Sequence, residues 1–300
     1  MKISDLINEI DGQLIRDGEF EVLEYCTSSC QKKFLSFLEN KKFVDKMNPN
    51  VSCIITTVEL KNEIPSFVEG IVVAREPKKV FGLLHNFMST KEEYAGKRFE
   101  TQIGQNCNIS PLAYIASENV VIGNNVIIAP FAVIRENVYI GDGCKIYEHS
   151  VIGGKGFNFV RTQDGKSIGM VDCGRVVLEK NVEIFSNCHI ASGPLPTDIT
   201  KLEENVKLDA FVHVGHGTRI GKRTLVPAGA QIGGNSNIGE DVWIGVNATI
   251  SNRIVIGDGG RVSLGAVVTK NVQKNETVSG NFAIPHAVFM EHVKASVTKE

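Results

Sequence analysis

The sequence has few aromatic side chains, no long apolar run and almost no excess charge of either sign. Only 7% of the residues are aromatic, so few bulky side chains are available for a core. Lys and Arg number 32 against 34 Asp and Glu, which disfavours nucleic acid as a partner. No stretch of about eighteen apolar residues exists, so no membrane-spanning helix is expected. The N-terminal stretch lacks the basic and then apolar order of a secretory signal, and a cytoplasmic protein is expected.

The seven cysteines lack the pairing pattern of a disulfide framework. They are odd in number and scattered, which fits a reducing compartment. Cys26 and Cys30 form a C-x3-C pair, but no second pair completes a zinc site. We therefore expect no bound metal.

What the sequence has instead is glycine, at 29 positions, and a strict period of six residues. An amphipathic helix would repeat about every 3.6 residues and a half-buried strand about every 2. A period of six fits triangular coils, in which each flat face points one aliphatic side chain inward before a turn. The aliphatic residues that share this spacing are Ile103, Ile109, Ile115, Ile122, Ile128, Ile134, Ile140, Ile146, Ile152, Leu178, Ile184, Ile190, Leu208, Val214, Ile220, Val226, Ile232, Ile238, Ile244, Ile250, Ile256, Val262 and Val268.

The repeat predicts a mainly β protein, a left-handed parallel β-helix built from hexapeptide repeats and spanning residues 101–284. Residues 1–100 have a different pattern and predict a small α/β domain, with a helix opened by Pro77. A short C-terminal helix is expected at residues 285–300.

Two segments, residues 154–175 and 192–198, interrupt the repeat. Loops that interrupt a solenoid usually lie on one face and often build its binding site. The alternative is that each is a tolerated insertion without a function.

His213 and His216 are the strongest candidates for proton transfer, because an imidazole titrates near neutral pH. They flank Val214, which occupies an inward position, so both should point outward from the coil. Asp209 lies seven residues before His216, about one face away, and could hold the imidazole in one tautomer. Two nearby histidines are also common as surface or packing residues, and a metal site would need further ligands.

The motifs, taken in order, resemble the bacterial UDP-3-O-acylglucosamine N-acyltransferases of lipopolysaccharide biosynthesis and their relatives that acylate nucleotide-linked amino sugars. The segment from Phe34 to Phe43 is similar to the family's pyrimidine-binding segment. The resemblance implies that Phe37 and Phe43 sandwich the base while Asn40 contacts its polar edge, although the family often has tyrosine at the position of Phe43. The alternative is that both phenylalanines belong to the core.

The resemblance extends to the proposed chemistry. It implies that His216 is the general base, that Asp209 is its partner and that the backbone amide of Gly234 stabilises the oxyanion. It also implies that His213 occupies the position of a polar residue that neighbours the catalytic histidine in the substrate site. Solenoids of this class usually form homotrimers, with the donor between the chains. No tightly bound cofactor is implied, because the acyl thioester is a co-substrate.

Two departures from the family affect the choice of substrates. Residues 191–198 replace an arginine-containing stretch, and the sequence stops soon after Pro285 without the family's longer helical tail, which contacts acyl carrier protein. Both favour acyl-CoA as the donor and a UDP- or dTDP-linked amino sugar as the acceptor. Four cations in the last coils could bind phosphates of coenzyme A or could be solvated turn residues: Arg253, Arg261, Lys270 and Lys274.

Four alternatives stay open at this point. The first is the acyl-carrier-protein-dependent N-acyltransferase of lipid A synthesis. The second is a non-catalytic protein that binds a nucleotide sugar. The third is a hexapeptide O-acyltransferase that needs no pocket for a base, and the fourth is a metal-dependent hydratase. The sequence leaves the acyl chain, the sugar and the position of the amine undetermined.

Overall fold

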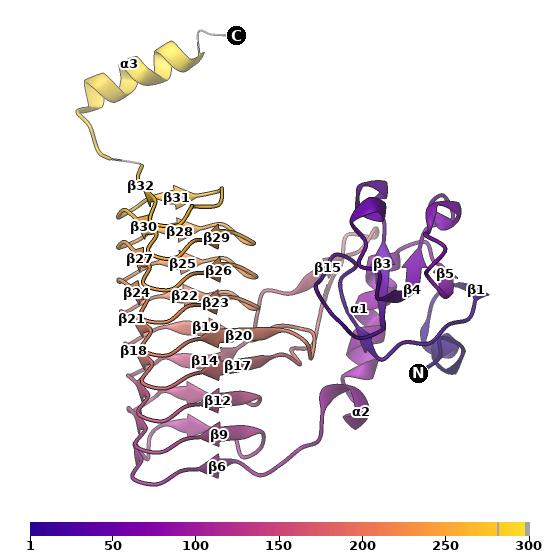
Figure 1. Cartoon of the computed structure of the whole chain (residues 1–300), viewed down its shortest axis with the longest axis horizontal. Coiled ribbons are helices and arrows are strands. Elements are labelled where there is room, and N and C mark those ends of the chain that lie inside the picture. The colour runs from indigo at the N-terminus through magenta and orange to yellow at the C-terminus, as the bar shows by residue number, and fades with distance from the viewer. Residues whose placement is uncertain (281, 298–300) are drawn as a thin grey trace.

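The computed structural model describes residues 1–280 and 282–297, and it consists of a long solenoid with a smaller domain on one side (Figure 1). The solenoid is a left-handed parallel β-helix, which confirms the fold class that the six-residue period predicts. The helix α3 (His286–Val297) lies beyond the last coil. None of the described helices is long and apolar enough to cross a lipid bilayer.

The N-terminal domain is a five-stranded sheet, with the order β1-β5-β4-β3-β2, packed against helices. Only β1 runs antiparallel to its neighbour. The strands are β1 (Gln13–Arg16), β2 (Val22–Leu23), β3 (Phe34–Leu38), β4 (Val51–Thr56) and β5 (Gly70–Val73). The helices are α1 (Pro77–Met88), α2 (Glu92–Ala95) and the short 3-10 helices η1 (Ser4–Glu9), η2 (Lys41–Lys46) and η3 (Lys61–Glu63). Pro77 opens α1, as expected of a residue without an N–H to leave unpaired.

Three parallel sheets form the faces of the solenoid, and each turn of the chain adds one short strand to each face. The first face contains β6 (Gln102–Ile103), β9 (Val120–Ile122), β12 (Val138–Ile140), β17 (Arg175–Leu178), β20 (Ile199–Leu202), β23 (Arg219–Ile220), β26 (Asn237–Ile238) and β29 (Val255–Ile256). The second contains β7 (Asn108–Ile109), β10 (Ile127–Ile128), β13 (Lys145–Ile146), β18 (Glu183–Ile184), β21 (Lys207–Leu208), β24 (Leu225–Val226), β27 (Trp243–Ile244), β30 (Arg261–Val262) and β32 (Thr277–Val278). The third contains β8 (Tyr114–Ile115), β11 (Val133–Ile134), β14 (Val151–Gly154), β19 (His189–Ala191), β22 (His213–Val214), β25 (Gln231–Ile232), β28 (Thr249–Ile250) and β31 (Val267–Val268).

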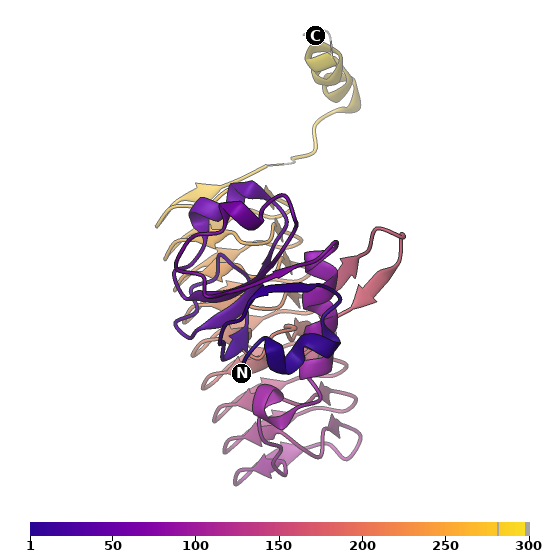
Figure 2. The same cartoon turned by 90° about the vertical axis from the view of Figure 1, so that its right-hand side faces the viewer.

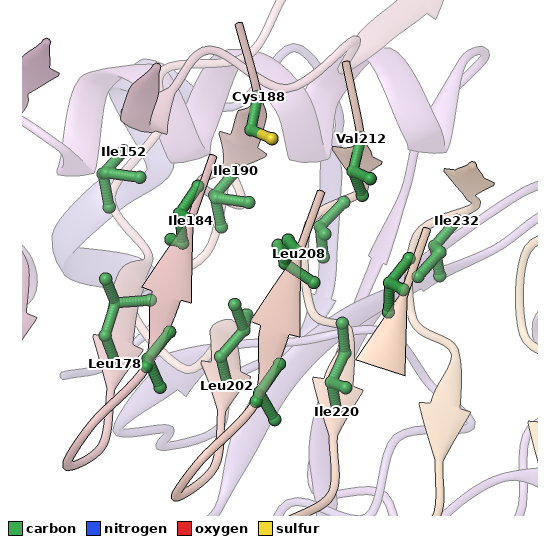
Figure 3. Close-up of a cluster of buried hydrophobic side chains, with 14 of the residues drawn as sticks. Ile152, Leu178, Ile184, Cys188, Ile190, Leu202, Leu208, Val212, Ile220 and Ile232 are labelled. Atoms are coloured by element: carbon green, nitrogen blue, oxygen red, sulfur yellow. The ribbon is translucent and has the colours of Figure 1, made fainter. Parts of the chain in front are cut away.

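The core of the solenoid is a continuous column of the repeating aliphatic side chains, part of which is shown in Figure 3. Most repeats also point a second side chain inward, usually a small or β-branched one, four positions after the aliphatic residue. Thr218 and Thr224 occupy such positions, are fully buried, and donate to the carbonyls of Gly233 and Gly239 at 3.2 and 2.9 Å. The expectation of one inward side chain per face is therefore wrong, because a second side chain is also buried next to the corner in most repeats.

Ile103, the first residue of the repeat, is 52% exposed because no coil precedes it to cover the end of the column. The end of a stacked solenoid has a neighbour on one side only.

Both interruptions of the repeat project from the corner between the third face and the first, and both pack on the N-terminal domain. The first contains the hairpin of β15 (Phe159–Arg161) and β16 (Ser167–Gly169), which lies beside α1 (Figure 2). Nε2 of His85, on α1, lies 2.7 Å from the carbonyl oxygen of Val171. The second interruption inserts Leu195, which is fully buried, into the core of the N-terminal domain. The two loops therefore fix the domain against one corner of the solenoid, which we call the site corner.

Candidate functional site

A cavity of about 620 Å³ lies between the N-terminal domain and the site corner. Its volume is typical of a small-molecule site. It brings together residues that are far apart in the sequence: Tyr25, Cys26, Thr27, Phe37, Leu38, Glu39, Asn40, Phe43, Lys78, Phe157, Asn158, Phe159, Val160, Met170, His216, Gly234, Asn235, Asn252 and Arg253. Phe37, Asn40 and Phe43, which are predicted to bind the base, therefore share one cavity with His216 and Gly234.

The side of the cavity formed by the N-terminal domain carries the two phenylalanines and the asparagine that the resemblance singled out. Phe37 is half-buried on β3, and its ring centroid lies 5.1 Å from that of Phe81 and 6.2 Å from that of Tyr25. Phe43 is half-buried on η2. Both rings are thus partly in the core and partly at the cavity, and their contact with a base stays a prediction.

Asn40 has a structural role besides lining the cavity. Its Oδ1 accepts the N–H of Lys42 at 3.1 Å and caps η2. Side-chain caps of this kind satisfy N–H groups that a helix leaves unpaired at its start. With its oxygen engaged, the amide N–H₂ of Asn40 is the group that remains for a ligand, and it can only donate.

His216 occupies the turn that follows β22, outside the aliphatic column, and is half-buried at the cavity. Its Nδ1 is buried and has no hydrogen-bond partner among the described residues. Burial lowers the pKa of His216 below the ordinary histidine value, and the charge of Arg253 acts in the same direction, while Asp172 opposes it. A neutral imidazole is the form that can accept a proton.

Gly234 lies on the coil after His216, against the imidazole ring. A Cβ at this position would lie 3.3 Å from both Nε2 and Cδ2 of His216. The turn engages the carbonyl of Gly234, which accepts the N–H of Arg253 at 3.0 Å. No backbone carbonyl of the described residues accepts the N–H of Gly234. This N–H is therefore available near the imidazole, which is what the predicted oxyanion-stabilising role requires.

The structure does not bring Asp209 to His216 within the chain. Asp209 is exposed at the preceding corner, between the second and third faces, and its Oδ1 accepts the N–H of Ala210 at 2.7 Å. The carboxylate whose charge acts on His216 is that of Asp172, in the first interruption. The predicted pairing of Asp209 with His216 is thus not formed in one chain, because seven residues along a triangular coil lead to the next corner.

His213 also lies away from the cavity. It is half-buried on the outer surface of β22, as its flanking position predicts, and its ring stacks on that of His189 at a centroid distance of 5.3 Å. Burial lowers the pKa of His213, with His189 contributing in the same direction. His213 lies on the face of the third sheet and does not line the cavity with His216, and its role in the substrate site stays a prediction.

Several cavity residues carried no signal of their own in the sequence. Tyr25 and Lys78 lie in the N-terminal domain, and Asn158 lies in the first interruption. Only the loss of the six-residue period at residues 154–175 pointed toward Asn158. Arg253, considered above as a ligand for coenzyme A phosphates, lines the same cavity and has a φ of 62°, a conformation that asparagine or glycine adopts more easily. Across residues 1–280 and 282–297, no group of three or more His, Cys, Asp or Glu converges as a metal site would require.

Comparison with known proteins shows which of them share this fold and parts of this sequence. The bacterial transferase hexapeptide (six repeats) family matches residues 119–154 and 199–234. A UDP-N-acetylglucosamine acyltransferase from Campylobacter jejuni has a similar structure, with a TM-score of 0.53 and 22% sequence identity. The match covers 60% of this chain and 68% of that one, and it shows a shared fold.

Curated relatives match more of the chain than the repeats alone. A UDP-3-O-acylglucosamine N-acyltransferase of Methylobacillus flagellatus is 27% identical over 301 residues, which cover 92% of this chain and 84% of that protein. A protein of the same name from Coxiella burnetii is 26% identical over 251 residues, covering 75% of this chain and 72% of its own length. The similarity thus includes the N-terminal domain as well as the solenoid.

Proposed function

We propose that this chain, a hexapeptide-repeat protein related to the UDP-3-O-acylglucosamine N-acyltransferases, transfers an acyl group from a thioester to the amine of a UDP-linked 3-O-acylglucosamine. The observation that carries the proposal is that His216, Gly234 and the aromatic residues Phe37 and Phe43 line one cavity. A base, an oxyanion donor and a surface on which a pyrimidine can stack are what this reaction requires.

The relatives change the choice of substrates that the sequence favoured. Their shared name specifies UDP-3-O-acylglucosamine as the acceptor, and one of them aligns with 92% of this chain. We therefore place UDP ahead of dTDP and place an acyl-carrier-protein thioester ahead of acyl-CoA. The alternative that the sequence left open is thus better supported than the one it favoured.

The cavity has groups suited to each part of the acceptor. The base would lie between Phe37 and Phe43, with the amide N–H₂ of Asn40 donating to a base carbonyl. Lys78 and Arg253 are the two cations of the cavity lining and suit the diphosphate, since charged donors form strong hydrogen bonds to phosphate oxygens. The sugar would then lie toward the solenoid and present its amine to His216.

The reaction is a direct displacement. The neutral amine attacks the thioester carbonyl carbon and forms a C–N bond, and His216 accepts a proton from the nitrogen. The negative charge that develops on the carbonyl oxygen is stabilised by the N–H of Gly234. When the C–S bond breaks, the thiolate takes the proton from the imidazolium, and the amide and a free thiol are the products. His216 ends each turnover neutral, as it began.

We also propose that the protein is a homotrimer in which the donor lies between neighbouring chains. Asp209 stands one corner away from His216 in its own chain, so a role beside an imidazole requires a neighbouring subunit. Multi-angle light scattering should give three times the mass of one chain. A stable monomer with full turnover would contradict this part of the proposal.

The test of function is a thiol-release assay on the full chain. Acyl-carrier-protein and acyl-CoA thioesters would each be combined with UDP-3-O-acylglucosamine and with UDP- and dTDP-linked amino sugars. We expect turnover with UDP-3-O-acylglucosamine, and we expect His216→Ala to lower it by about 10² or more. Unchanged turnover of the His216→Ala protein would refute the role of His216. Binding of UDP without turnover for any donor would favour a non-catalytic protein.

A further inference from the structure

Asp172 lies where the two interruptions of the repeat meet, in the lining of a second cavity. The second cavity has a volume of about 480 Å³ and is lined in part by Arg135, Lys155 and Asp172. Asn158 lines both this cavity and the cavity of His216. The Asn158 amide donates from Nδ2 to Oδ1 of Asp172 at 3.2 Å. This hydrogen bond therefore links Asp172 to the wall of the cavity that contains His216.

The second interruption fixes the backbone that carries Asp172. The N–H of Cys173 donates to the carbonyl of Pro194 at 3.0 Å, and the N–H of Gly174 donates to the carbonyl of Gly193 at 2.9 Å. Asp172 itself is half-buried. Its main chain is thus held by one loop and its side chain by the other.

Gly156 occupies a point of the first loop that has no room for a side chain. A Cβ at position 156 would lie 2.4 Å from Nδ2 of Asn158 and 2.8 Å from the carbonyl oxygen of Ser192. Real Cβ atoms do not approach other atoms so closely, and one of the contacts is with backbone. The absence of a side chain at Gly156 therefore lets the Asn158 amide reach Asp172.

The charges that act on His216 are few. Among the described residues they are Asp172, from the first interruption, and Arg253, from the coil beyond Gly234. The charges of His216 and Lys155 act in turn on the Asp172 carboxyl, and Asp172 acts on Asp198 of the second interruption. Burial raises the pKa of the Asp172 carboxyl, while the Asn158 hydrogen bond and the charges of His216 and Lys155 lower it. Within one chain, Asp172 is thus the carboxylate of the described residues whose charge acts on the imidazole.

We propose that Asp172, held by Asn158, is the positioning residue that stabilises the protonated form of His216 during acyl transfer. The proposal rests on the proposed function, because the imidazolium arises when the attacking amine gives up its proton. A carboxylate beside an imidazolium lowers the free energy of that ion pair relative to the separate neutral forms. Asp172 does not touch the reacting atoms in this scheme and acts only through His216.

The experiment is a titration of His216 by NMR in the full-length protein, without substrate, compared between wild type and Asp172→Asn. We expect the pKa of His216 to fall by up to about one unit in the variant, because an opposite charge nearby favours the protonated imidazole. Asn158→Ala should shift it in the same direction by less. Glu136→Gln is the matched control: Glu136 is exposed, lines the second cavity and exerts no charge effect on His216, so its titration curve should coincide with that of wild type.

The kinetic arm measures kcat/KM against pH for the acyl transfer. In Asp172→Asn the fall in rate at low pH should move to lower pH, and the plateau should drop roughly tenfold, less than for His216→Ala. The affinity for UDP should not change. An Asp172→Asn protein with the wild-type His216 titration and the wild-type pH profile would overturn the proposal.

The two proposals fail in different ways. If no donor and acceptor pair gives turnover, the proposed function is wrong, yet the NMR titration still decides whether Asp172 acts on His216. If turnover is found and depends on His216 while the titration does not respond to Asp172, the positioning role alone is refuted. Should Asp172→Asn fail to fold, Asn158→Ala supplies the same comparison of titrations.

Discussion

Gly234 packs so closely on the ring of His216 that the two residues form one surface at the site corner. A Cβ at Gly234 would lie 3.1 Å from the His216 carbonyl oxygen and 3.3 Å from ring atoms Nε2 and Cδ2. The residues belong to successive coils, with the N–H of Asn235 donating to the carbonyl of His216 at 2.7 Å. The base and the proposed oxyanion donor are therefore held at a fixed spacing by the backbone of the solenoid itself.

Gly234→Ala tests this arrangement. The added methyl group would push the imidazole away or narrow the space for the thioester, so we expect kcat/KM to fall by about 10². Gly280→Ala is a suitable control because a Cβ at Gly280 meets no atom within 4 Å. Circular dichroism and the unfolding midpoint should be close to those of wild type for both proteins. A Gly234→Ala enzyme with normal turnover would show that the contact is not part of the reaction.

The two charges that act on His216 have opposite signs, so removing one or the other should shift the pH dependence of the rate in opposite directions. His216 must be neutral to accept a proton, and burial places its pKa below the ordinary 6.5. The rate in wild type should therefore reach half of its plateau below pH 6.5. Arg253→Gln removes a positive charge that lowers this pKa, so the half-maximal pH should rise, opposite to the shift expected for Asp172→Asn.

Arg253→Gln should also raise KM for the UDP-linked acceptor if the guanidinium contacts the diphosphate. Steady-state kinetics between pH 5 and 9 would measure both effects. A half-maximal pH that does not move would contradict the assigned influence of Arg253 on His216.

Asp198 should reduce the stability of the fold at neutral pH. Burial raises its pKa from 3.8 to about 6, and the neighbouring Asp172 acts in the same direction. The folded state thus binds this proton more tightly than the unfolded state, so this contribution to stability is present below about pH 4 and is lost as pH rises toward 6. Asp198→Asn should raise the free energy of unfolding by about 1–2 kcal/mol at pH 7.5 and change it little at pH 4.

Urea denaturation at the two pH values measures this difference. Asp45→Asn, at an exposed position on η2, provides a control for the removal of one negative charge. An equal effect of Asp198→Asn at both pH values would mean that the carboxyl is not the group that titrates.

Leu195 should be the main apolar anchor between the second interruption and the N-terminal domain. It is fully buried in that domain's core, and next to it Oγ1 of Thr197 donates to Oε2 of Glu24 at 2.6 Å. Leu195→Ala should destabilise the protein by about 2–5 kcal/mol, the range for truncating a buried leucine.

Leu264→Ala is the matched control, since Leu264 is 64% exposed. Hydrogen exchange should show whether Leu195→Ala also loosens α1 and the loops of the cavity. Unchanged stability would mean that the N-terminal domain is held to the solenoid by the hairpin of β15 and β16 alone.

The six-residue period was sufficient to predict the β-helix because the spacing corresponds directly to the geometry of the coil. One aliphatic side chain at every sixth position can form a single column only if each repeat forms one face of a triangle. The second column was missed because its residue types vary, from Ala230 and Val242 to threonines such as Thr218, whose hydroxyl donates to a carbonyl of the next coil. The domain limits stay predictions. Residues 298–300 of the expected C-terminal helix lie outside the described part of the chain.

For the site, the sequence indicated single residues but not their neighbours. Because His213 and His216 flank the inward-pointing Val214, the sequence predicted that His216 lies outside the column, and this is where the structure places it. The proposed partner of His216 was not predictable from spacing, since Asp172 is in a segment with no repeat. That segment is positioned by contacts with α1, Pro194 and Gly193.

The sequence by itself determined the local, periodic part of this protein: which residues point inward, where the coils turn and where the repeat fails. Only the tertiary structure decided which of the interrupting residues meet at His216 and which do not. The physical reason is that a repeat encodes contacts between fixed neighbours, while Asp172, Asn158 and the N-terminal domain are brought together by long-range packing that no spacing records.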